Sequence, residues 1–138
     1  MAEMSQQEIS ALLAEPHLAH LVTVRPDGRP HVAPLWYMEE DGRAFVIAEG
    51  NAVKLRNIRR NPAVSLSIAT DNRPYKYVIL QGEGTVTEHN LAQVVERLCV
   101  RYDGPERGAA FAKELLSNRT FRLIDIRVTR VTGWKDDE

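Results

Sequence analysis

The chain of 138 residues has a single cysteine, Cys99, and no long apolar run. One cysteine excludes an internal disulfide and any metal site built from several thiolates. The longest apolar stretches, such as Val46 to Ala48 and Val78 to Leu80, are far shorter than the roughly 20 residues that cross a bilayer as a helix. The segment from Met1 to Glu8 is polar and acidic, unlike a secretory signal. We therefore expect no membrane partner and a cytoplasmic location.

A strong charge of one sign is also missing, since the net charge is −1. A protein that binds long nucleic acids usually carries a clear positive excess, so this balance argues against that class of function. The hydrophobic content of 43% and the charged content of 27% are typical of a globular protein. The length predicts one domain over residues 1–138.

Several catalytic signatures are absent as well. No serine lies in a Gly-x-Ser-x-Gly turn, and the pair Gly82-x-Gly84 lacks the third glycine and following helix of a dinucleotide motif. The four histidines show no metal-ligand spacing; they are His17, His20, His31 and His89. We expect no metal site and find no support for a nucleophilic triad.

The apolar pattern predicts strands joined by short turns, with helices between them. Ser5 and Glu8 form a capping box that begins a helix, which ends before Pro16. Asn51 is a suitable N-cap for a second helix. The predicted strands are 18–25, 30–38, 44–48, 63–69, 75–87 and 120–134, and the further helices are 52–60, 88–102 and 106–116. The first three strands are predicted to form an antiparallel meander because their connections are short.

Six strands with charged turns favour a sheet closed into a barrel, because closure removes exposed strand edges. Gly82 and Gly84 within the long strand predict a bulge or bend. Cys99 is expected on the buried side of its helix. A barrel of this size has no room for a bulky ligand. A cofactor would therefore lie in an outer groove, completed by a second subunit.

The helix after Asn51 has a concentration of basic residues and no acid between Lys54 and Arg60. Lys54 falls in the first turn, where the helix dipole already favours an anion and a cation is misplaced for the helix alone. We infer that Lys54 serves a bound phosphate. Arg59 and Arg60 lie near the helix C-terminus, where a solvated basic face is an equally good explanation.

The second predicted strand offers another candidate surface. Pro30 and Pro34 remove ladder donors, so the strand borders an opening or contains a bulge. Trp36 and Tyr37 point to opposite faces, so at most one of them belongs to the core. The segment from Tyr75 to Tyr77 is an aromatic and basic strand edge, which suits either contact with a cofactor or an exposed strand start.

At these residues the sequence resembles the pyridoxamine 5′-phosphate oxidase-like split-barrel family, which contains enzymes that use FMN and enzymes that use the deazaflavin F420. The segments that carry the resemblance are residues 18–31, 54–62, 73–78 and 130–134. It implies a mainly β (α+β) fold, a six-stranded antiparallel split β-barrel with peripheral helices. It also implies a homodimer with two cofactors in grooves between the subunits.

The resemblance further implies which residues contact the cofactor. Those beside the phosphate would be Lys54, Arg56 and Asn57, and those lining the ring along the second strand would be Pro34, Leu35 and Trp36. The segment passing beside the ring would be Ala48, Glu49, Gly50 and Asn51. The residues reaching the cofactor from the other subunit would be Tyr75, Lys76 and Tyr77.

The expected function is that of an oxidoreductase, in which bound F420 or FMN passes a hydride to or from a small organic substrate. No side chain is assigned as a catalytic acid or base; Tyr37 and His31 are possible proton donors without an identified partner. The arginine and histidine residues that hold pyridoxal phosphate in the oxidase have no equivalents here, so pyridoxamine oxidation is not expected. Two alternatives remain open, a carrier or sensor that binds the cofactor without turnover, and a nucleic-acid-binding barrel that uses Arg56, Arg59 and Arg60.

Overall fold

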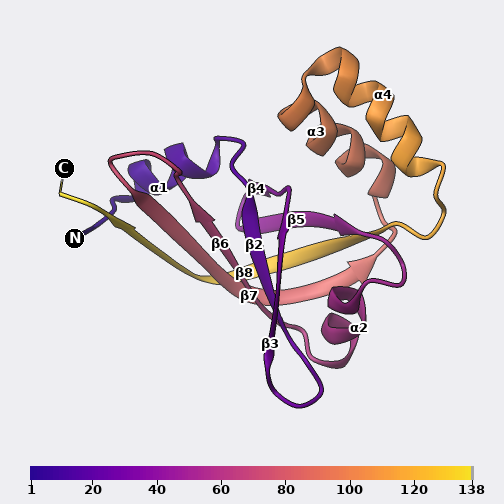
Figure 1. Cartoon of the computed structure of the whole chain (residues 1–138), viewed down its shortest axis with the longest axis horizontal. Coiled ribbons are helices and arrows are strands. Elements are labelled where there is room, and N and C mark those ends of the chain that lie inside the picture. Colours follow the sequence, from indigo (N-terminus) through magenta and orange to yellow (C-terminus); the bar gives the residue numbers. More distant parts are fainter. Residues whose placement is uncertain (138) are drawn as a thin grey trace.

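Strands and helices follow one another along the chain in the computed structural model, which describes residues 1–137 (Figure 1). The strands are β1 (Ala2–Glu3), β2 (Ala19–Val24), β3 (Pro30–Leu35), β4 (Met38–Glu40), β5 (Arg43–Ala48), β6 (Ala63–Ala69), β7 (Lys76–Thr87) and β8 (Arg122–Lys135). The helices are α1 (Gln6–Leu13), α2 (Val53–Arg60), α3 (Leu91–Asp103) and α4 (Pro105–Leu116). None of the described helices is long and apolar enough to cross a membrane.

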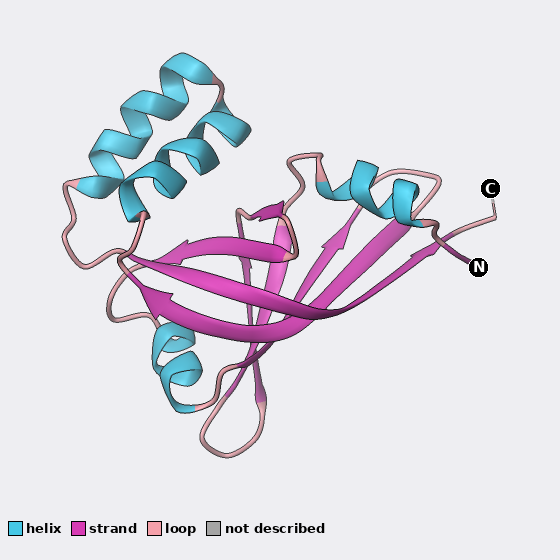
Figure 2. Ribbon diagram, turned by 180° about the vertical axis from the view of Figure 1, so that it is seen from behind, coloured by secondary structure: helices cyan, strands magenta, loops and turns pink. Residues whose placement is uncertain are grey.

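All of these strands belong to one antiparallel sheet with the order β3-β2-β6-β7-β8-β5-β4, and β1 pairs with β8 outside this path. The long strands β7 and β8 curve strongly, so that the sheet bends into an open barrel (Figure 2). This confirms the mainly β barrel with peripheral helices. The sheet has eight described strands rather than the six predicted, because the predicted second strand is divided and the short β1 adds another.

The predicted strand 30–38 is interrupted at Trp36 and Tyr37, and its two parts join opposite ends of the sheet. β3 pairs with β2 and β4 pairs with β5, so the predicted three-stranded meander is wrong. The physical reason is a side chain 65 residues away: the hydroxyl of Tyr102 accepts the N–H of Tyr37 at 3.1 Å and lies within hydrogen-bonding distance of the carbonyls of His17, at 2.7 Å, and Tyr37, at 3.2 Å. A neighbouring strand is therefore not needed to satisfy this backbone.

Alternate residues of the strands fill the barrel, as the half-buried patterns predict. Its fully buried members include Leu21, Val46, Leu66, Ile68, Val78, Ile124 and Ile126, with Leu55 added by α2. The helices α3 and α4 lie together to one side of the sheet (Figure 1). Cys99 is buried between them with Val95 and Ala112, which confirms its expected position.

The glycines of β7 serve two different purposes. The register of β7 against β8 shifts between Gln81 and Gly82, which confirms the predicted bulge. A Cβ on Gly82 would lie 2.0 Å from the carbonyl oxygen of Arg127, so a larger residue does not fit there. Gly84 lies under Ile58 of α2, where a Cβ would be 3.4 Å from the Ile58 side chain. Gly82 therefore makes the bulge, and Gly84 lets the helix approach.

The two predicted N-caps have different outcomes. Ser5 caps α1 and forms the full capping box with Glu8, as predicted. The N-cap of α2 is Ala52 and not Asn51, and no side chain caps this helix. The Asn51 carbonyl instead accepts a hydrogen bond from Arg56 at 2.9 Å. The first-turn N–H groups of α2 consequently have no side-chain acceptor.

Candidate functional site

Helix α2 is held against the barrel by polar contacts to β2. Asn57 Nδ2 donates to Thr23 Oγ1 at 3.0 Å, and Arg60 donates both to the carbonyl of Val24 and to Asn57 Oδ1. Thr23 is fully buried and Asn57 is 2% exposed. Both ends of the Asn57 amide are thus occupied inside the protein. Asn57 positions α2 and does not face a ligand groove, in contrast to the phosphate role implied by the resemblance.

Lys54 lies three residues before Asn57, so the two side chains share the face of α2 that is turned toward the barrel. Lys54 is half-buried, and this burial lowers the pKa of its ammonium below the ordinary value. None of the ion pairs or hydrogen bonds formed by residues 1–137 involves its side chain. Burying a charge without a partner is costly, which is the property expected of a side chain that serves a bound anion.

The other basic residues of α2 differ from Lys54. Arg56 is exposed and binds the Asn51 carbonyl, closing the connection that precedes the helix. Arg60 donates hydrogen bonds to the Val24 carbonyl of β2 and to Asn57 Oδ1. Arg59 is exposed and forms no ion pair within the described residues, which suits the solvated face considered from the sequence. Among the cations of α2, Lys54 is therefore the best placed for a ligand.

His31, which the sequence offers only as a possible proton donor, lies near Lys54. His31 on β3 is the direct cross-strand partner of Thr23, which holds α2 through Asn57. The pKa of His31 is lowered first by burial and then by the positive charges of Arg25 and Lys54. The pairing register of β2 and β3 would have placed His31 near α2, because it sets His31 directly opposite Thr23, the residue to which α2 is hydrogen-bonded.

The connection from β5 to α2 runs through Ala48, Glu49, Gly50 and Asn51. Ala48 is buried, whereas the Glu49 carboxylate accepts a hydrogen bond from Asn118 Nδ2 at 2.8 Å. A Cβ on Gly50 would lie 2.9 Å from both the Cβ and the carbonyl oxygen of Thr120. The connection is thus fixed against the loop between α4 and β8. It leads directly into the turn that carries Lys54.

The ring-lining candidates lie at the far end of β3 from His31. Pro34 is exposed and Leu35 packs partly against the barrel core. Trp36 stacks on Tyr102 with ring centroids 4.6 Å apart and an interplanar angle of 2°. Trp36 lies five positions after His31, or roughly 16 Å at the rise of a strand. Because side chains alternate along a strand, Leu35 shares the face of β3 that carries His31, whereas Pro34 lies on the opposite face.

Tyr37, considered as a proton donor from the sequence, faces the core. It is fully buried, and its hydroxyl donates to the carbonyl of Leu13 at 3.0 Å. Burial raises the pKa of Tyr37 well above its usual range. The residue is consequently a structural hydrogen-bond donor that does not reach a substrate.

Tyr75, Lys76 and Tyr77 lie far from α2 within the same chain. They mark the start of β7, near the chain termini, whereas α2 packs near Gly84 toward the other end of that strand (Figure 1). Eight residues separate Lys76 from Gly84, or roughly 25 Å in a strand. One chain therefore does not bring this segment and Lys54 into a single site.

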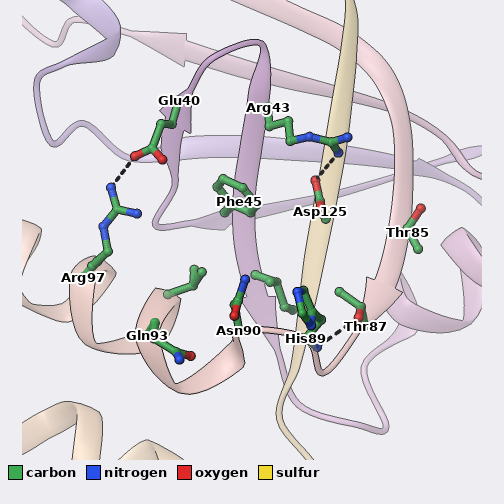
Figure 3. A pocket seen from close by; sticks show the side chains of 12 residues that line it. Glu40, Arg43, Phe45, Thr85, Thr87, His89, Asn90, Gln93, Arg97 and Asp125 are labelled. Atoms are coloured by element: carbon green, nitrogen blue, oxygen red, sulfur yellow. Dashed lines mark hydrogen bonds and ion pairs between the residues drawn. The ribbon is translucent and has the colours of Figure 1, made fainter.

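A separate cavity of about 610 Å³ lies between α3 and the sheet (Figure 3). None of the predicted site residues lines it. The charges at its rim pair with one another, Arg43 with Asp125 at 3.0 Å and Glu40 with Arg97. These four charged side chains thus have partners within the protein, unlike Lys54.

Solved structures share this fold. An F420 reductase has 29% identity and a TM-score of 0.71, with 88% of this chain and 94% of that protein covered. The conserved hypothetical protein Rv2991 of Mycobacterium tuberculosis has 25% identity and a TM-score of 0.82, with coverage of 96% and 85%. The heme storage protein HutZ of Vibrio cholerae has 20% identity and a TM-score of 0.75, with coverage of 94% and 93%, and shows the fold alone.

No curated protein matches the sequence. A family model does match, over residues 5–135, and its description is pyridoxamine 5′-phosphate oxidase. This match includes every strand of the sheet path and all four described helices. The chain therefore belongs to the pyridoxamine 5′-phosphate oxidase family of split-barrel proteins.

Proposed function

We propose that this protein is an oxidoreductase that binds FMN or F420 and passes a hydride to or from a small organic substrate. The observation that carries the proposal is the half-buried Lys54 at the start of α2, which has no anionic partner among residues 1–137. Family membership and the 29% identity to an F420 reductase support a flavin-type cofactor. The bound cofactor would supply the redox chemistry.

The residues of the chain fit such a cofactor in three ways. Lys54 and the uncapped first turn of α2 offer a positive charge and free N–H groups to a phosphate. Gly50 packs against Thr120, where a Cβ would lie 2.9 Å away, so the connection that would pass beside the ring is held in place. Pro34, Leu35 and Trp36, at the end of β3 and just after it, would orient the ring and exclude water.

We further propose that the active form is a homodimer with a cofactor between the subunits. Tyr75, Lys76 and Tyr77 are too far from Lys54 within one chain, but they can reach the site from a second copy. Val32, on the edge strand β3, is 55% exposed and would be covered by a second copy. Paired cations and aromatic side chains from two chains would then enclose the cofactor.

The experiment is a titration of the purified protein with FMN and, separately, with F420, followed by absorption spectroscopy. Binding of either cofactor with a perturbed spectrum supports the proposal. The loaded protein is then screened with chemical reductants and candidate acceptors. A cofactor that binds but exchanges electrons with none of them would favour the carrier or sensor. A colourless protein that binds neither cofactor, and binds single-stranded nucleic acid with a steep salt dependence, would favour the nucleic-acid alternative.

A further inference from the structure

The imidazole of His31 has an unusual environment for its two nitrogens. Nδ1 is buried and has no hydrogen-bond partner. Nε2 is not a buried atom without a partner. A neutral imidazole has one N–H and one lone pair, and its surroundings decide which nitrogen keeps the proton. A buried N–H without an acceptor is rarer in proteins than an acceptor without a donor. We therefore infer that the proton of His31 resides on Nε2.

Burial and the neighbouring positive charges both lower the pKa of the His31 ring. Arg25 from the end of β2 and Lys54 from α2 both act on it, and both are positive. The acid of the adjoining hairpin, Asp27, accepts a hydrogen bond from the backbone of Arg29 and pairs with its side chain. Burial together with Arg25 and Lys54 places the pKa of His31 below its ordinary value. A third positive charge in the cluster is thus disfavoured.

We propose that the neutral ring of His31 donates its Nε2–H to an oxygen of the same anionic group that Lys54 binds, with Arg25 supplying a second positive charge. The inference rests on the proposed function and deepens it, because it adds two residues to the phosphate site: His31 on β3 and Arg25 directly after β2. The recognised chemistry is that of a phosphate monoester or a similar oxyanion. A neutral donor adds a hydrogen bond there without repelling the two cations.

Matched ligands and matched variants test this assignment. Riboflavin has the FMN ring without the phosphate. The ratio of the dissociation constants of riboflavin and FMN therefore measures how much the phosphate contributes to binding. His31→Gln keeps an N–H at the reach of Nε2, whereas His31→Asn carries its amide at the reach of Nδ1. We expect H31Q to retain FMN affinity within about threefold and H31N to lose about tenfold, the value of one hydrogen bond to a charged group. Riboflavin affinity should stay unchanged in both, and His89→Asn, at an exposed position, is the control.

Nitrogen NMR of the wild-type protein supplies a readout independent of affinity. It should show the Nε2–H tautomer of His31, and FMN should perturb the Nε2 signal. A proton on Nδ1, equal FMN affinity in H31N and wild type, or an equal loss of riboflavin affinity in H31N would overturn the assignment. If Lys54→Ala still weakens FMN in that case, the proposed phosphate site stands and His31 alone is excluded. If wild type does not distinguish FMN from riboflavin, the proposed phosphate site itself fails.

Discussion

Asn57 and Thr23 form a buried hydrogen bond, 3.0 Å from Nδ2 to Oγ1, that ties helix α2 to strand β2. The bond fixes the rotation of α2 about its own axis. Lys54, one turn earlier, then faces the same part of the barrel, and His31 lies across the strand from Thr23. This buried hydrogen bond between Asn57 and Thr23 thus determines where the candidate phosphate site lies.

Asn57→Ala should destabilise the fold. The change leaves the Thr23 hydroxyl buried without its partner, at a cost of ~1–3 kcal/mol. Urea unfolding measures this as a lower midpoint with an unchanged slope. Arg59→Ala is the matched control on the same helix, because an exposed side chain without a described ion pair should change stability by less than ~0.5 kcal/mol. Equal stability of the two variants would contradict the structural role of Asn57.

The basic helix shows what the sequence can and cannot predict. The sequence predicts the position of the helix, the place of Lys54 in its first turn and the place of Arg59 near its end, although the N-cap is Ala52 and not the predicted Asn51. The role of Asn57 does not follow from the sequence, because an asparagine amide binds a phosphate or a buried hydroxyl equally well. The partner that decides between them, Thr23, lies 34 residues away on another element.

Gly82→Ala should be more damaging than Gly84→Ala. A Cβ on Gly82 meets the Arg127 carbonyl oxygen at 2.0 Å, which is backbone and has no rotamer to change. A Cβ on Gly84 meets the side chains of Ile124 and Ile58 at 3.3 and 3.4 Å, which yield more easily. Overpacking costs ~1–3 kcal/mol in typical cores, and we place G82A at or above the upper end. Thermal unfolding of both variants gives the comparison, and a G84A melting temperature below that of G82A would disagree with the bulge geometry.

The ion pair between Glu8 and Lys135 should make stability depend on acid pH. The hydrogen bond from Lys135, followed by the one from the Ser5 backbone, lowers the pKa of Glu8 from 4.5 to about 2. Because the folded pKa is the lower one, the stabilisation is complete well above pH 4.5 and is lost as the pH falls through about 2. Glu8→Gln should therefore be less stable than wild type at pH 7, and the difference should shrink steadily as the pH is lowered toward 2. Urea unfolding at several pH values measures this, with exposed Glu96→Gln as the control; a difference independent of pH would contradict it.

The interrupted strand shows a second limit of the sequence. Pro30 and Pro34 correctly predict an unusual strand, since β3 lies at one end of the sheet path. The break at Tyr37 depends on the hydroxyl of Tyr102, which belongs to a helix much later in the chain. Periodicity describes each segment by itself, so it does not reveal a backbone that is satisfied by a distant side chain.

Val32→Asp should separate the proposed dimer without unfolding the subunit. Val32 is 55% exposed, so the change costs the isolated subunit little, but it would place an unpaired carboxylate in the interface. Sedimentation analysis should show a dimer for wild type and a monomer for the variant, with FMN affinity lost along with the dimer. Glu96→Gln, on the exposed side of α3, is expected to remain dimeric. A monomeric wild-type protein that still binds the cofactor would contradict the shared site.

The measurement that tests the central claim most directly is FMN and F420 binding by wild type and Lys54→Ala, together with their melting temperatures. Loss of a charge-assisted hydrogen bond is worth ~1.5–3 kcal/mol, so we expect affinity to fall by roughly ten- to a hundredfold. The melting temperature should stay nearly unchanged, because Lys54 has no partner within the described chain. A variant that binds as tightly as wild type, or one that loses stability while keeping its affinity, would contradict the assignment of Lys54 to the cofactor phosphate.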